Sequence, residues 1–145
     1  MRMAGVSKIE ELERGSGAPV ELRVRAEADQ LPVVRAVAET LVVLSDFTLD
    51  DIADVKLVVD EVCSQLIKGS VADSELSCLF SVSDSGIRIV VTSTLAATSV
   101  PKKDSFGWHV LQTLTDSIEL RADDADDSDA VRTVAIDVVK RRSTI

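Results

Sequence analysis

The apolar positions in residues 55–70 follow the three- and four-residue spacing of an amphipathic helix. In the same stretch, Glu61 and Gln65 stand four residues apart, so their side chains stack on one helix face. A carboxylate and an amide beside a buried stripe could form a small polar site, or both could be ordinary surface residues. The pattern alone favours the second interpretation. Thr48 or Asp50 is expected to cap this helix, and Gly69 is expected to end it.

Two shorter helices flank this one. Apolar residues with helical spacing run from about Leu31 to Leu44, after a possible cap at Asp29 and with Pro32 in the first turn. Another helix is predicted over residues 106–114, capped by Asp104 or Ser105.

Alternating apolar and polar residues predict five strands. Two of them are separated by a turn at residues 83–86 that ends in glycine, which predicts a β-hairpin. Residues 93–103 are expected to form a loop, and residues 123–129 an acidic turn. The predicted strands are residues 20–26, 76–82, 87–92, 117–121 and 130–139.

This order, β-α-α-β-β-α-β-β, predicts an α+β fold in two layers: a five-stranded mixed, mostly antiparallel sheet with three helices on one face. One domain is expected over residues 19–140. Residues 1–18 are expected to be a flexible segment and residues 141–145 a frayed basic tail.

The charge of the chain excludes some functions. Its 145 residues carry a net charge of −9. This charge disfavours binding to nucleic acid and favours binding to a basic protein. Neither a membrane span nor a signal peptide is visible in the sequence, so a cytoplasmic protein is expected. Cys63, Cys78 and His109 are too few for a zinc site. The cysteines are interpreted as buried thiols, with a redox switch as the alternative, and His109 as structural.

Three segments carry a family resemblance: VVDEVCSQLI at residues 58–67, SFGWHVLQTLTD at 105–116 and RTVAIDV at 132–138. Together with the element order, they resemble the GHKL ATPase fold, and more narrowly the RsbW/UsfX-type anti-sigma-F factors and serine kinases. The resemblance covers residues 20–139. It implies a site for ATP and Mg²⁺, in which Glu61 is the catalytic glutamate and Gln65 replaces the family's metal-binding asparagine.

The resemblance places other residues at the nucleotide as well. Ser93 stands where the family has the aspartate that accepts a hydrogen bond from adenine, and the two glycines that follow in the family are Leu95 and Ala97 here. Ser105 and Gly107 stand where paired glycines open the last helix, and Thr133 belongs to the last matched segment. Trp108 adds bulk beside them and is expected in the core or at the nucleotide pocket. The departures predict weak or absent kinase activity and nucleotide binding.

The implied function is to sequester an alternative sigma factor of the sigma-F/sigma-B type, with release by a STAS-domain antagonist. Two alternatives stay open: an active ATP-dependent serine kinase that phosphorylates the antagonist, and a generic α+β scaffold for an unrelated protein. Arg35 lies where the family contacts the sigma factor, and Glu39 is a second candidate for that contact. The two residues are four apart, so they could equally form a surface ion pair with each other. The resemblance also implies a homodimer.

Overall fold

The structure, a computed structural model, describes residues 19–123 and 130–143. The segment predicted to be flexible, residues 1–18, and most of the predicted acidic turn lie outside the described residues. The elements in chain order are β1 (Val20–Arg25), the 3₁₀ turn η1 (Ala28–Gln30), α2 (Leu31–Leu44), α3 (Leu49–Gly69), β2 (Glu75–Ser83), β3 (Gly86–Ala96), the 3₁₀ turn η2 (Ala97–Ser99), α4 (Phe106–Leu114), β4 (Ser117–Ala122) and β5 (Val131–Arg141).

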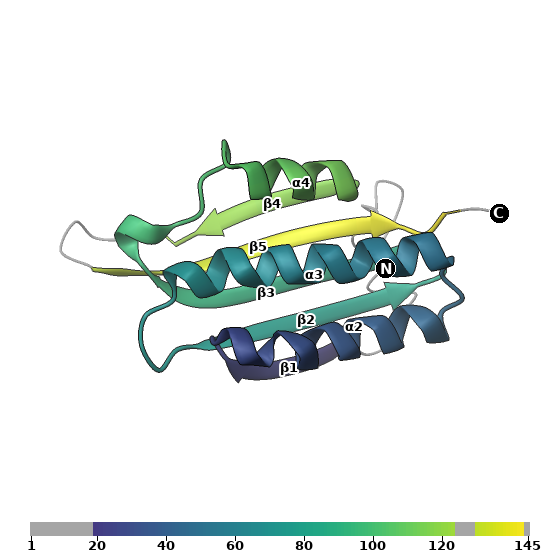
Figure 1. Cartoon of the computed structure of the whole chain (residues 1–145), viewed down its shortest axis with the longest axis horizontal. Helices are drawn as coiled ribbons and strands as arrows, with labels where there is room; N and C mark the ends of the chain where they lie inside the picture. Colours follow the sequence, from purple (N-terminus) through teal and green to yellow (C-terminus); the bar gives the residue numbers. More distant parts are fainter. Residues whose placement is uncertain (1–18, 124–129, 144–145) are drawn as a thin grey trace, which may run out of the picture.

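The strands form one sheet in the order β1-β2-β3-β5-β4, and the three helices lie side by side over one of its faces, with α3 between α2 and α4 (Figure 1). The predicted two-layer α+β sandwich is therefore confirmed. The expectation of a mixed sheet is wrong, because all four strand pairings are antiparallel. The reason is that β5 returns from β4 and inserts between β3 and β4, where it is antiparallel to both.

The core lies between the sheet and the helices and is almost entirely aliphatic. Alternate residues of β3 face the helices, and Val58, Val62 and Leu66 of α3 are buried against them. Both cysteines are buried in this layer, as predicted. Trp108, which is only 2% exposed, packs into the same core from α4.

The helix ends correct several local predictions. The central helix begins at Leu49, and its cap is Thr48, whose hydroxyl accepts a hydrogen bond from the Asp51 amide at 3.1 Å. Asp29 caps nothing: it lies in the η1 turn, and α2 starts after Gln30 without a side-chain cap. Gly69 is the last residue of α3, and its role is close packing, because a Cβ there would lie 2.5 Å from the carbonyl oxygen of Ser99.

The C-terminal residues up to Ser143 are held against the domain, although the sequence predicted a frayed tail. The Ser143 amide and hydroxyl donate to the buried carboxylate of Asp51 at 2.7 and 2.9 Å. Lys140 Nζ lies 3.4 Å from Asp54 and 3.9 Å from Asp51. Burial raises the pKa of Asp51, but the hydrogen bonds from Ser143 and the charge of Lys140 bring the pKa below its usual value. The end of β5 is thereby tied to the first turns of α3.

A second buried carboxylate lies on the face of the sheet opposite the helices. Asp137 of β5 is only 4% exposed and accepts two hydrogen bonds from Arg88 of β3, at 3.1 and 2.8 Å, and one from Arg121 of β4 at 2.9 Å. These bonds join three neighbouring strands across the middle of the sheet.

Candidate functional site

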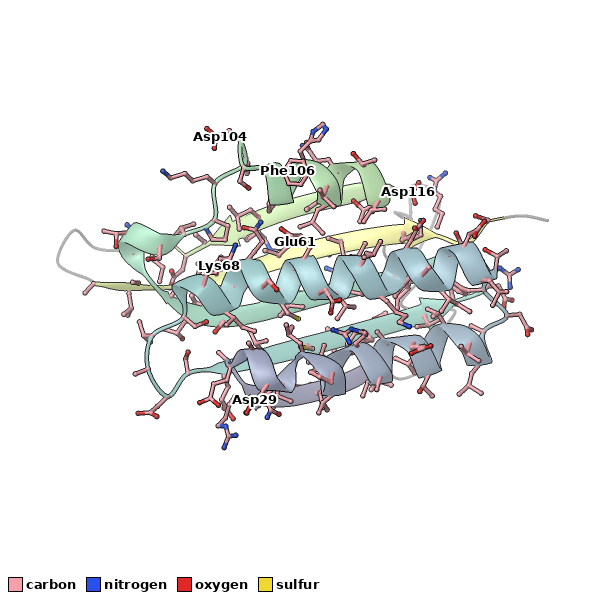
Figure 2. All side chains as sticks on the ribbon, viewed as in Figure 1. Asp29, Glu61, Lys68, Asp104, Phe106 and Asp116 are labelled. Atoms are coloured by element: carbon pink, nitrogen blue, oxygen red, sulfur yellow. The ribbon has the colours of Figure 1, made fainter. Side chains whose placement is uncertain are left out.

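Glu61 and Gln65 lie in the middle of α3 and are hydrogen-bonded to each other. The side-chain amide of Gln65 donates to Glu61 Oε1 at 2.9 Å, and both side chains are half-buried. Figure 2 shows Glu61 on the side of α3 that faces α4. The stacking predicted from their spacing is confirmed, and the carboxylate and the amide are hydrogen-bond partners of each other.

The first turn of α4 rests directly on this pair. A Cβ built at Gly107 would overlap Glu61 Oε1 and Gln65 Nε2, so only glycine fits without moving them. The turn is fixed by Ser105, the predicted cap, whose hydroxyl accepts from the Trp108 amide at 3.1 Å. The structure therefore brings Gly107 to Glu61 and Gln65, and Ser105 lies two residues earlier as the cap of the same helix.

Ser93 belongs to a separate, buried polar network. It is 4% exposed, and its hydroxyl lies 3.0 Å from that of Ser70 and donates to the Glu75 carbonyl oxygen at 2.9 Å. The loop predicted for residues 93–103 begins only after Ala96, because β3 continues to that residue. Leu95 is fully buried there and packs towards the end of α3.

Thr133 lies away from the Glu61–Gln65 pair, but it borders the same pocket as Ser93, on the strand paired with β3. It is exposed on the side of the sheet opposite the helices, since its neighbour Val134 is fully buried against them. There it borders an open polar pocket of about 360 Å³ with Arg23 and Ser77. The structure does not bring Thr133 to the Glu61–Gln65 pair.

The ATP and Mg²⁺ implied by the resemblance do not fit these residues as they are arranged. The backbone at Gly107 occupies the space beside Glu61 and Gln65. The Ser93 hydroxyl is almost inaccessible and is bonded within the protein.

Arg35 is held by α3 rather than by its own helix. Its guanidinium donates to Asp60 Oδ1 through Nε at 2.9 Å, and Nη2 lies 2.9 Å from the same oxygen. The alternative of an Arg35–Glu39 pair is wrong, because Glu39 lies 3.6 Å from Lys56 instead. Asp60 was missed from the sequence, since no spacing within one helix indicates which residue of the next helix it will contact.

These two ion pairs span a shallow groove between α2 and α3. The groove has a volume of about 510 Å³ and an apolar lining that includes Ala53 and the half-exposed Leu57. The two helices together carry six carboxylates and three cations. Two of the carboxylates do not face the groove, because Asp51 is buried and Glu61 lies on the side of α3 that faces α4. The two cations at the groove are each paired with one carboxylate.

Comparison with known proteins finds sequence relatives of the chain. Over 100 residues, the chain is 30% identical to the anti-sigma-F factor RsbW of Mycobacterium tuberculosis, in both strain CDC 1551 / Oshkosh and strain ATCC 25618 / H37Rv. The chain is a relative of the RsbW-type anti-sigma factors. The match covers 69% of this chain, and the resemblance predicted from the sequence is confirmed.

The matched region covers 60% of the length of each RsbW relative. No family model matches the chain. In residues 19–123 and 130–143, no helix is long and apolar enough to cross a membrane.

Proposed function

We propose that the chain binds and sequesters an alternative sigma factor of the sigma-F/sigma-B type in the cytoplasm, and that an antagonist of the STAS-domain class releases it. The observation that carries the proposal is the 30% identity with two proteins named anti-sigma-F factor RsbW. The net charge of −9 supports it, because the promoter-reading regions of sigma factors must be basic to bind DNA.

Arg35 is the proposed contact for the sigma factor. Its side chain is about one-third exposed and is pre-oriented by Asp60 at the edge of an apolar groove. A pre-oriented arginine loses little conformational entropy on binding, and arginine is enriched among residues that dominate interfaces. The homodimer stays a prediction, for which the outer edge of β1 offers an unpaired strand in the described sheet.

Arg35→Ala is expected to weaken sigma-factor binding about tenfold, because it removes the charge and the planar donors together. The measurement is titration calorimetry of the full chain against the alternative sigma factors of the organism, each purified separately. Lys56→Ala is the matched control: it removes one cation from the same groove, where Lys56 makes only an exposed pair with Glu39. If both variants weakened binding equally, the loss of affinity would be explained by the loss of a positive charge alone. This result would contradict a specific role of Arg35. No binding of any sigma factor by the unchanged protein would contradict the function itself.

We propose further that sequestration proceeds by binding alone, with nucleotide binding weak or lost. Titration with Mg·ATP is expected to give no saturable heat below about 1 mM, which corresponds to roughly 4 kcal/mol of binding free energy. The arrangement of Gly107 over Glu61 and Gln65 supports this expectation. Tight, Mg²⁺-dependent binding that disappears in Glu61→Ala would instead establish the serine-kinase alternative.

A further inference from the structure

The contact between Arg35 and Asp60 engages one side of the guanidinium group. Nε of Arg35 donates to Asp60 Oδ1 at 2.9 Å, and Nη2 lies 2.9 Å from the same oxygen. These two nitrogens lie on the same side of the planar group, so Asp60 is seated on that side. The end of the group, formed by Nη1 and Nη2, carries a second pair of parallel N–H donors and faces away from the arginine stem.

Asp60 also ties Arg35 to a different helix. Arg35 belongs to α2, whose Val34 and Ala38 are fully buried, and Asp60 belongs to α3, whose Val59 is 1% exposed. Because the core fixes both backbones, a bond between the helices fixes the side chain of Arg35 relative to the whole domain. The side chains of Arg35 and Asp60 are 35% and 36% exposed, so the ion pair adds little to stability. Its main effect is on the conformation of Arg35.

Two opposite effects on binding follow from this contact. A long arginine side chain loses rotamer freedom when a partner orders it, and Asp60 imposes this loss before the partner arrives. Asp60 also supplies a negative charge, which competes with any acceptor that a partner brings to Arg35. The geometry favours the first effect, because Asp60 occupies the Nε side and the parallel donors at the end of the group point elsewhere.

We propose that Asp60 is a positioning residue for sigma-factor binding, which acts through Arg35 by presenting the end of the guanidinium group to an acceptor on the sigma factor. This inference rests on the proposed function, in which Arg35 is the contact. It goes beyond that function in one respect: the loss of Asp60 weakens binding only while Arg35 is present.

The first measurement uses the protein without a partner. The NMR order parameter of the Arg35 Nε–H group is expected to fall in Asp60→Ala from the range of ordered groups to below about 0.6. Asp54→Ala is the matched control, because Asp54 is also an aspartate of α3, is 37% exposed and lies 3.4 Å from a cation of another element, Lys140. It is expected to leave the order parameter unchanged. An Nε–H group that stayed rigid in Asp60→Ala would overturn the inference.

The second measurement is titration calorimetry of the full chain against the sigma factor. Asp60→Ala is expected to weaken binding about fivefold, and Asp54→Ala, which removes the same charge, less than about twofold. Asp60→Asn keeps an acceptor oxygen on a side chain of the same size, so it should weaken binding less than Asp60→Ala does. In the Arg35→Ala background, Asp60→Ala is expected to have no further effect, because the side chain that it positions is gone.

Three results of the titration would overturn the positioning role and leave the proposed function intact. Tighter binding by Asp60→Ala would identify Asp60 as a competitor for Arg35. An equal loss in Asp60→Ala and Asp54→Ala would identify an effect of general charge, and a further loss in the Arg35→Ala background would identify an action independent of Arg35. Absence of sigma-factor binding by the unchanged protein would overturn both the inference and the proposed function, and the order parameter would still report whether Asp60 holds Arg35.

Discussion

Asp137→Ala is expected to destabilise the protein by about 3 kcal/mol, because it breaks a buried network of ion pairs. The carboxylate is 4% exposed and holds Arg88 through two bonds and Arg121 through one, so its removal takes away a buried counter-charge that the two guanidinium groups share. The value is at the lower end of the range for broken buried ion pairs because the Arg121 side chain is 44% exposed and can be rehydrated. Urea unfolding at pH 7, followed by the fluorescence of Trp108, measures it.

A control for Asp137→Ala is available on the neighbouring strand. Glu119 lies 3.4 Å from the same Arg121, but its side chain is 63% exposed. Glu119→Ala is therefore expected to change stability by less than about 1 kcal/mol. Similar losses in the two variants would show that burial of the Asp137 carboxylate does not matter.

The same carboxylate makes stability depend on pH in the acid range. Burial raises the pKa of Asp137, but the hydrogen bonds and charges of Arg88 and Arg121 outweigh burial and hold the pKa below its usual value. A carboxyl whose folded pKa is lowered contributes its full stability above the unfolded value of about 3.9, and this contribution is lost as pH falls through the folded pKa. The stability difference between the unchanged protein and Asp137→Asn should therefore be constant near neutral pH and shrink below about pH 4. Asp51, whose pKa is also lowered, titrates in both proteins and does not enter the difference.

Local signals in the sequence predicted most of the fold. The glycine turn at residues 83–86 is the β2–β3 connection, and Ser105 is the cap of α4. Such features depend on residues close together in the chain, and their chemistry is visible in the pattern itself. The Glu61–Gln65 contact belongs to the same class, because four residues along one helix fix the distance.

Contacts between distant segments could not be predicted from the sequence. Arg35 and Asp60 are 25 residues apart, and Arg88 and Asp137 are 49 apart, so their pairing depends on how helices and strands are placed next to one another. Asp137 stands at a position whose alternation with Ile136 and Val138 predicts a solvent-facing residue, yet it is buried by its two arginines. The packing of Gly107 on Glu61 and Gln65 has the same origin, because it joins two helices that are far apart in the chain.

Trp108→Ala is expected to destabilise the protein by about 3–5 kcal/mol, because it removes the largest fully buried side chain and leaves a cavity between α4 and α3. The helix has only nine residues, so it has little stability of its own, and Trp108 and Leu111 are the buried residues that hold it. Circular dichroism during urea unfolding measures the loss, since the variant lacks the fluorescent residue. Trp108→Phe keeps a buried ring and should lose clearly less.

The loss of stability in Trp108→Ala should also be localised at the candidate site. If Trp108 holds α4 over α3, hydrogen exchange in Trp108→Ala should accelerate in residues 106–114 more than in β2 and β3, which keep their ladder bonds. Gly107 would then separate from Glu61 and Gln65, and the two side chains would become accessible to solvent. Mg·ATP binding that emerged in this variant would identify α4 as the element that closes the nucleotide site. Normal protection of residues 106–114 in Trp108→Ala would instead show that α4 is held by contacts other than this side chain.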